Sequence, residues 1–386
     1  MKAASVHYHL FSTLQEDDWI GCTDSHAAWS SRLANAPPID VVIPFFGSAD
    51  DLEELISAAA MWEGARRVIV VDDCSPAAAQ ARPVSDDLVV VRNERNLGFV
   101  SSVNRGIGLA EDSDVVVLNS DAKADGSWLR RLKISAYAFD RVASVSPLSN
   151  AAGFFSVPNS RKENDVPQGL DGETCSRILN FISPRIHEEA VVTSGFCWYL
   201  RRDALREVGL LDDRLFYRGY GEDNDFCRRA SAMGFKNLCS LQTFVSHIRG
   251  KSFGLEKFFL KQVNGKILGA LDPSGRASME AYEAKSVIPA LGIAFGDFIA
   301  AQNSDSIGEK IELPKNYCIV ANDALGTTAD HLELAPSREN LSVCWRGATT
   351  TLLVPQRKLG NFLNYLSLRF GISGVDSRVD PIGSAS

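Results

Sequence analysis

The chain has 386 residues, of which 45% are hydrophobic and 23% are charged. This is ordinary globular composition, and the length allows one large domain and a smaller one. The formal net charge of −8 at pH 7 excludes the basic surface with which proteins wrap the nucleic-acid backbone, so no nucleic-acid partner is expected.

Cysteine usage and apolar segments bear on the location of the protein. The eight cysteines are scattered without a Cys-x-x-Cys pair, which favours reduced thiols in a cytoplasmic protein. The amino terminus lacks the apolar core and the cleavage pattern of a signal peptide. The longest apolar stretch, Val287 to Ala301, contains Asp297 and is shorter than the ~20 residues of a spanning helix. We expect a cytoplasmic protein without a membrane span, and a peripheral contact with the inner face of the membrane stays open.

The first part of the chain divides into an arm and an alternating region. Residues 1–38 form an arm that ends at Pro37-Pro38, a pair that disfavours helix. Apolar runs then predict strands at 39–43, 67–71, 88–91 and 114–118, and the stretches around them predict helices at 50–62, 98–110 and 127–137. This alternation predicts an α/β fold with a mostly parallel, Rossmann-like sheet flanked by helices, an architecture that binds nucleotides.

The pattern weakens after residue 150. Residues 151–168 are expected to form an irregular loop over the site. Order is expected to return at 191–200, followed by helices at 203–208 and 223–233, a strand at 237–245, a largely helical region at 255–300, and short strands at 317–321, 341–345 and 349–354. We therefore divide the chain into the arm (1–38), a catalytic domain (39–270) and a carboxy-terminal α+β extension (271–386). The sequence leaves open the role of the extension and the oligomeric state of the protein.

Polar residues follow the second and third predicted strands. Asp72 and Asp73 come at the end of the second strand, where carboxylates can accept hydrogen bonds from a ribose hydroxyl or a base imide. Asn96 and Gly98 lie in a turn that leads into a helix, whose first N–H groups can face a diphosphate. Each pattern alone is equally compatible with a helix cap or a turn.

Two further motifs can hold a divalent cation and its diphosphate. The fourth strand ends in Asn119-Ser120-Asp121, where the carboxylate can share a hard cation with phosphate oxygens. His247 follows a later apolar strand, and its imidazole can complete the coordination of that cation. Lys251 and Ser252 follow closely and can hold phosphate oxygens. A turn and a structural histidine are the simpler interpretations of the two motifs.

The segment Gly221-Glu222-Asp223-Asn224-Asp225 opens a predicted helix. Phe226, Ala230 and Met233 follow at helical spacing, so they are expected to face the core and to leave the acids at the helix start pointing outwards. The helix dipole favours an ionised carboxylate there, which can remove a proton from an attacking hydroxyl. Capping alone requires fewer acids than this segment carries.

In this order the motifs resemble those of the family 2 glycosyltransferases, an inverting group with the GT-A fold, over about residues 39–253. Ile43-Pro44-Phe45-Phe46 resembles the opening strand, Asp72-Asp73 the nucleoside-binding acids, and Asn96-Leu97-Gly98 with Asn104 the next turn and helix. Leu118-Asn119-Ser120-Asp121 resembles the metal-binding Asp-x-Asp motif, with Asn119 in place of its first acid. A second departure is Cys74, which follows the nucleoside-binding acids at a position where glycine is more usual.

The resemblance implies roles for these residues. Asp223 would be the general base with Glu222 beside it, and Asp121 and His247 would bind Mg²⁺ or Mn²⁺. Pro44, Asp72, Asp73, Asn96, Gly98, Asn104, Asn119, Ser120, Lys251 and Ser252 would line the nucleotide-sugar site. The donor would be a UDP- or dTDP-linked sugar and the acceptor a glycan or a lipid-linked glycan. The subgroup it resembles includes bacterial rhamnosyltransferase-like enzymes of cell-surface polysaccharide synthesis.

Other functional classes fit less well. A nucleotidyltransferase would carry a glycine- and lysine-rich loop after the first strand, whereas residues 45–50 contain no lysine. A dinucleotide-binding oxidoreductase would carry Gly-x-Gly-x-x-Gly there. A catalytically silent protein that keeps the fold to bind a glycan or a partner remains the alternative, because Asn119 departs from the metal motif.

Overall fold

The computed structural model describes residues 31–59, 62–76, 83–85, 87–124, 126–167, 169–183, 186–216, 218–248 and 256–305, and the five strands between 318 and 376. Lys251 and Ser252 lie outside the described residues.

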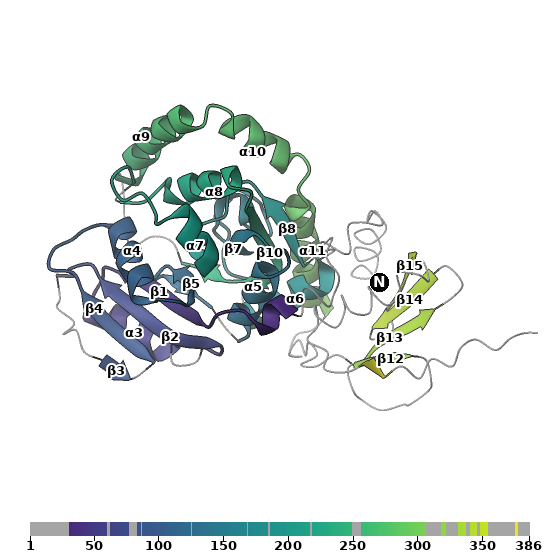
Figure 1. Cartoon of the computed structure of the whole chain (residues 1–386). Helices are drawn as coiled ribbons and strands as arrows, with labels where there is room; N and C mark the ends of the chain where they lie inside the picture. The colour runs from purple at the N-terminus through teal and green to yellow at the C-terminus, as the bar shows by residue number, and fades with distance from the viewer. Residues whose placement is uncertain are drawn as a thin grey trace, which may run out of the picture.

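The core of the protein is a nine-stranded sheet with the order β3-β4-β2-β1-β5-β9-β7-β10-β8 (Figure 1). Its strands are β1 (Ile39–Phe45), β2 (Ala65–Asp72), β3 (Pro83–Ser85), β4 (Leu88–Arg92), β5 (Asp114–Leu118), β7 (Val142–Leu148), β8 (His187–Ala190), β9 (Cys197–Leu200) and β10 (Lys236–Phe244). The pairs β1–β2, β2–β4, β1–β5 and β7–β10 are parallel, whereas β9 is antiparallel to both β5 and β7. The expected α/β class with a mostly parallel sheet is confirmed.

Helices cover both faces of this sheet because its strands are apolar on both sides. In β1, Val41 and Ile43 face one core layer, which also holds residues of α3 (Ala49–Ala59), α5 (Trp128–Ala136) and α6 (Gly172–Ile182). Val42 between them faces the other layer, formed with α4 (Phe99–Leu109), α7 (Arg202–Val208) and α8 (Glu222–Ala232). The period-two alternation of β1 thus assigns each helix to one side.

Several elements differ from the sequence-based expectation. β7, α6 and β8 were not expected, and within the ordered segment expected at 191–200 the strand β9 begins only at Cys197. Asp171 caps α6 by accepting a hydrogen bond from Thr174 N, so an N-cap signal was present in the sequence. Met233 was expected in the core but is 46% exposed, because α8 ends at Ala232 and Met233 only caps it.

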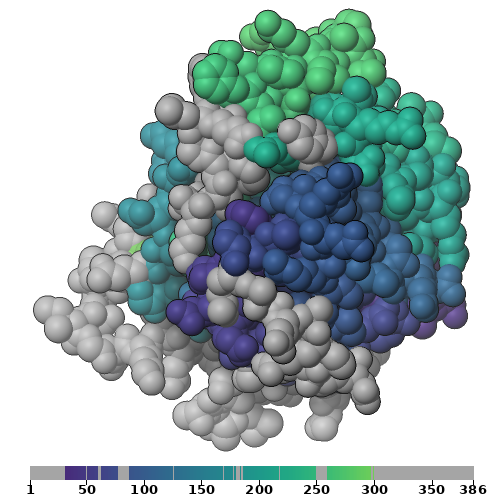
Figure 2. Space-filling model, turned by 90° about the vertical axis from the view of Figure 1, so that its left-hand side faces the viewer, coloured from purple at the N-terminus to yellow at the C-terminus, as the bar shows by residue number. Residues whose placement is uncertain are grey.

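Beyond the sheet, α9 (Glu256–Leu271), α10 (Gly275–Glu283) and α11 (Ile288–Asp305) follow in turn. Figure 1 shows α9 and α10 above α8, and Figure 2 shows this green region at the outer margin of the molecule. Leu291 and Phe295 of α11 are buried in the same core layer as α6. A separate five-stranded sheet has the order β15-β14-β13-β12-β16. No helix among the described residues is long and apolar enough to span a membrane.

The strands of this second sheet are β12 (Cys318–Ala321), β13 (His331–Pro336), β14 (Asn340–Trp345), β15 (Ala348–Leu353) and β16 (Val375–Asp376). Three of them, β12, β14 and β15, coincide with the short strands expected near the carboxyl terminus. The division of the chain at residue 270 falls within α9, one residue before its end, so it does not coincide with a break between elements.

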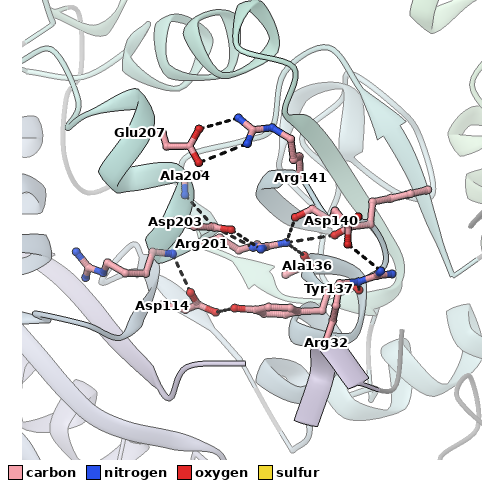
Figure 3. Close-up of polar contacts among 12 residues, drawn as sticks. Arg32, Asp114, Ala136, Tyr137, Asp140, Arg141, Arg201, Asp203, Ala204 and Glu207 are labelled. Carbon is pink, nitrogen blue, oxygen red and sulfur yellow. Dashed lines mark hydrogen bonds and ion pairs between the residues drawn. The ribbon is translucent and has the colours of Figure 1, made fainter. Parts of the chain in front are cut away.

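A buried carboxylate ties the amino end of β5 to its neighbours (Figure 3). Asp114 accepts hydrogen bonds from the hydroxyls of Tyr137 and Tyr199, each at 2.6 Å, and from the backbone N–H of Arg202 at 2.8 Å. Burial raises the pKa of Asp114, while these hydrogen bonds oppose the rise. Because Asp114 is at the end of β5 opposite to Asp121, we assign it to the scaffold.

Two glycines of α4 provide a test of this packing. A Cβ on Gly106 would lie 2.2 Å from Val42 Cγ1, whereas a Cβ on Gly108 would meet nothing within 4 Å among the described residues. We expect Gly106→Ala to lower the free energy of unfolding by about 1–3 kcal/mol, because the methyl group overpacks the contact with β1. Gly108→Ala, the control, should raise it by about 0.5–1 kcal/mol. Urea denaturation measures both, and equal effects would contradict the close packing of α4 on β1.

Candidate functional site

The carboxyl ends of β1, β2 and β5 meet at one edge of the sheet, where ligands of open α/β folds bind. Pro44 is buried within β1, and the backbone N–H of Asp73 donates to Phe45 O at 2.8 Å. Directly after β1, Phe46 is 56% exposed. Sequence reasoning placed Phe46 in the opening strand without a role, yet an exposed ring at this edge can stack on a nucleoside base.

Asp72 is occupied within the protein. It is fully buried, forms an ion pair with Arg92, and accepts a hydrogen bond from Ser75 N at 2.9 Å. The next residue, Cys74, has a φ of 61°, a left-handed conformation that glycine adopts more easily. The ion pair and the hydrogen bond thus hold the loop after β2 in a shape that a side chain at position 74 does not favour by itself.

Asp73 shapes the next turn. Its Oδ1 accepts hydrogen bonds from Asn93 Nδ2 at 2.8 Å and from Leu97 N at 2.7 Å, and its Oδ2 accepts from Gly98 N at 2.8 Å. The N–H of Gly98, expected to face a diphosphate, therefore faces a carboxylate of the protein. The side chain of Asn96 is exposed beside this turn.

Asn104 connects α4 to a later loop. Its Nδ2 donates to Leu211 O at 2.8 Å, and its Oδ1 accepts from Leu211 N at 3.1 Å. Both polar atoms of the amide thus have a backbone partner. Contacts with the nucleotide stay predictions for Asn104, and also for Asp72, Asp73, Asn96 and Gly98.

The segments of Asp121 and His247 lie side by side. Ala122 of β6 (Ala122–Lys123) pairs with His247 of β11 (Ser246–His247) in an antiparallel ladder. Ile248 N also donates to Asp121 O at 3.0 Å. As a result Asp121 Oδ1 lies 3.2 Å from His247 Nε2. The structure therefore brings together the two residues that the sequence assigned to the metal.

The environment of His247 determines its tautomer. Its Nδ1 lies 3.0 Å from Ala151 O, and because a carbonyl only accepts, Nδ1 carries the proton. In the neutral ring, Nε2 then keeps a lone pair directed towards Asp121, as in histidines that bind metals. Asn150 holds the backbone of His247, accepting from its N–H at 2.8 Å and donating to its carbonyl at 3.1 Å. Sequence reasoning missed Asn150, which lies in the loop after β7.

Asn119 adds an amide to this pair. Its Nδ2 lies 3.4 Å from His247 Nε2, and its Oδ1 is buried without a hydrogen-bond partner in the described part of the chain. Ser120 beside it is exposed. Carboxylate oxygen, imidazole nitrogen and a free amide oxygen are ligands that Mg²⁺ and Mn²⁺ accept, so the residues present fit such a cation. No group of three or more His, Cys, Asp and Glu residues that could hold a metal occurs in the described ranges.

Glu222 and Asp223 are the first two residues of α8 and lie close to Gly195. Glu222 is buried and its Oε2 accepts from Gly221 N at 3.0 Å, which corrects the expectation that it points out of the packed layer. Asp223 is half-buried and accepts from Asn224 N at 2.8 Å and from Gly195 N at 3.3 Å. A Cβ on Gly195 would lie 3.3 Å from Glu222 Oε1, so glycine permits this close approach.

The two carboxyl groups influence each other's protonation. Burial, together with the neighbouring charge of Asp223, raises the pKa of Glu222 to about 8. Burial also raises the pKa of Asp223, although the hydrogen bonds from Asn224 and Gly195 oppose that rise. The pair therefore shares its protons near neutral pH, with Asp223 the more readily ionised member.

Phe196 and Gly195 link the two halves of the site. The ring of Phe196 stacks on His247 with centroids 4.9 Å apart, and Phe196 O accepts a hydrogen bond from Asn119 N at 2.8 Å. Gly195, the preceding residue, donates to Asp223. Consecutive residues thus contact the Asn119–Asp121–His247 cluster and the carboxylate pair.

Comparison with known proteins gives one family match. Residues 40–209 match the model of the family described as glycosyl transferase family 2. The match ends before Glu222, Asp223 and His247. A curated relative, the succinoglycan biosynthesis protein ExoO of Rhizobium meliloti (strain 1021), is 35% identical over 104 residues, which make up 26% of this chain and 30% of the relative. The similarity thus spans less than a third of that relative's length.

Solved structures show distant similarity. The mannosyltransferase PcManGT from Pyrobaculum calidifontis, in complex with GDP-Man and Mn²⁺, has 15% identity and a TM-score of 0.45, with 79% of this chain and 84% of that chain covered. GalNAc-T7 with UDP, GalNAc and Mn²⁺ has 15% identity and a TM-score of 0.44, with 73% and 59% covered.

The raised pKa of Glu222 predicts a dependence of stability on pH. The folded protein keeps a proton that the unfolded chain releases above its ordinary pKa of 4.5, so the free energy of unfolding should fall as pH rises from there to about 8. Glu222→Gln should reduce this fall by on the order of 2 kcal/mol in urea titrations at several pH values. Glu207→Gln, which alters an exposed ion pair with Arg141, is the control. A Glu222→Gln profile parallel to that of wild type would contradict the burial of this carboxyl group.

The amide of Asn119 predicts weak metal binding in the absence of nucleotide. Asn119→Asp adds a second carboxylate beside Asp121 and His247, and we expect it to tighten Mn²⁺ binding by about tenfold because ligand charge tunes affinity. Asn35→Asp, in an exposed position, adds the same charge elsewhere and should have no effect. Calorimetric titration with Mn²⁺ measures both. Equal affinities in the two variants would show that Asn119 does not face the cation.

Proposed function

We propose that this chain, which belongs to glycosyl transferase family 2 through residues 40–209, is a metal-dependent glycosyltransferase. It moves a sugar from a nucleoside-diphosphate sugar to a hydroxyl group of a glycan or a lipid-linked glycan, with inversion at the anomeric carbon. The observation that supports the proposal is the link through Gly195 and Phe196, which connects the Asn119–Asp121–His247 cluster to a carboxylate pair with a raised pKa.

The donor side is the edge of the sheet formed by β1, β2 and β5. The exposed ring of Phe46 offers a stacking surface to the base, and the loops held by Asp72 and Asp73 border it. Asp121, His247 and Asn119 would hold Mg²⁺ or Mn²⁺, which neutralises charge on the departing nucleoside diphosphate when bound. Lys251 and Ser252 remain proposed diphosphate contacts.

The acceptor side is the start of α8. Asp223, the more exposed carboxylate of the pair, takes the proton from the acceptor hydroxyl while the oxygen of that hydroxyl forms a bond to the anomeric carbon. The bond between that carbon and the diphosphate oxygen breaks on the opposite face, which inverts the centre. Glu222 stays protonated near neutral pH because of its burial, and this keeps Asp223 ionised.

The biological setting we propose is surface polysaccharide synthesis in bacteria, in the cytoplasm. The named relative supports it, since its description refers to succinoglycan biosynthesis. We propose UDP- or dTDP-linked sugars as donors, and a lipid-linked acceptor would bring the protein into peripheral contact with the inner face of the membrane.

The test is turnover across a panel of UDP-, dTDP- and GDP-sugars with Mg²⁺ or Mn²⁺, for wild type, Asp223→Asn and the exposed control Asp140→Asn. We expect metal-dependent release of nucleoside diphosphate in wild type and in the control. Asp223→Asn should lose at least about a hundredfold in rate, because it removes the general base, and should still bind the nucleotide.

Three outcomes separate the possibilities. Full activity of Asp223→Asn would reject the assignment of the base. Release of nucleoside diphosphate without any dependence on metal would reject the role of Asp121 and His247. Neither turnover nor nucleotide binding with any donor would favour a catalytically silent binding protein.

A further inference from the structure

Helix α9 lies on the surface, and a buried polar side chain connects it to the loop before α8. Phe259 is 64% exposed, and among residues 259–271 Asn264, at 5%, is the sole buried side chain. Its Nδ2 donates to the buried carbonyl of Gly219 at 2.9 Å. Ile267 and Leu268, one turn further, pack partly against the core layer that contains α8. Figure 2 shows this green region standing at the margin of the molecule.

The carbonyl that Asn264 binds belongs to an unusual loop. Gly219, Tyr220 and Gly221 have φ values of 90°, 67° and 149°, so three consecutive residues have a positive φ. Such a conformation persists only where the surroundings determine it. A Cβ on Gly221 would lie 2.7 Å from the ring of Phe216 and 3.4 Å from Leu268 of α9, so these two side chains fill the space beside Gly221.

This loop leads directly into the carboxylate pair. Gly221 N donates to Glu222 Oε2 at 3.0 Å, and a Cβ on Gly219 would lie 3.7 Å from that same oxygen. The direction of the loop therefore sets where Glu222 and Asp223 begin α8. A shift of Gly219 changes the position of both carboxyl groups.

We propose that Asn264 is a positioning residue for transfer: by holding Gly219 it keeps Glu222 and Asp223 at the distance from the donor that the attacking hydroxyl requires. The proposal rests on the proposed function. It assigns to α9, an element outside the family match, control over the acceptor half of the site and not over nucleotide or metal binding. The anchor acts through the loop, and Asn264 itself touches neither substrate.

The experiment compares Asn264→Leu, which keeps the branched shape of the side chain and removes the donor, with Gln262→Leu, which also replaces an amide by leucine, at an exposed position of α9. We expect Asn264→Leu to lower kcat by about tenfold to a hundredfold, because small displacements of catalytic groups cost this much. The KM for the donor and the calorimetric affinity for UDP with Mn²⁺ should stay unchanged, and Gln262→Leu should resemble wild type in every measurement. Asn264→Ala serves if Asn264→Leu does not fold.

A second readout follows the loop itself. Hydrogen exchange at residues 219–223 should be faster in the Asn264 variant than in wild type, whereas exchange in β6 and β11 should be the same. A variant with unchanged kcat, or with unchanged exchange at 219–223, would overturn the proposal, and so would a loss of nucleotide affinity equal to the loss of kcat. Absence of turnover in wild type would overturn the proposed function and this inference with it, which distinguishes the two failures.

Discussion

Asn119 and His247 are 128 positions apart in the sequence, and a ladder of only two residues per strand holds their segments together. A ladder this short is not stable by itself. It persists because Asn150 binds the backbone of His247 on both sides and because Phe196 O accepts from Asn119 N. The loop after β7 and the start of β9 thus determine the geometry of the Asn119–Asp121–His247 cluster. The site depends on the order of strands in the sheet more than on any single motif.

Charge is distributed unevenly across the site. Asp72 has Arg92 as its partner, Asp73 has backbone and amide donors, and Asp121 lies beside the ring of His247. Within the described part of the chain, no basic side chain pairs with Glu222 or Asp223. Two neighbouring carboxylates without a cation cannot both ionise easily, and one shared proton relieves their repulsion. Because the described residues give this pair no basic partner, burial raises the pKa of both carboxyl groups.

Much of the fold could be predicted from the sequence, because strands such as β1 and β5 are apolar on both faces and end in polar turns. For the same reason Asp72 and Asp121 could be placed at one sheet edge. The internal partners of Asp73 and Asn104 could not be predicted, since they depend on contacts across distant loops. Asn150 was missed because a single asparagine in an irregular segment carries no periodic signal. The antiparallel placement of β9 between β5 and β7 was not predicted either, because it depends on tertiary context and not on local pattern.

The most direct test of the account is pulsed electron paramagnetic resonance of the protein with Mn²⁺ and UDP, for wild type and for His247→Ala. The account predicts a nitrogen hyperfine coupling from a directly bound imidazole in wild type and its loss in the variant, because Nε2 of His247 carries the free lone pair. Nucleotide-dependent Mn²⁺ binding without that coupling in wild type would contradict the placement of the cation between Asp121 and His247.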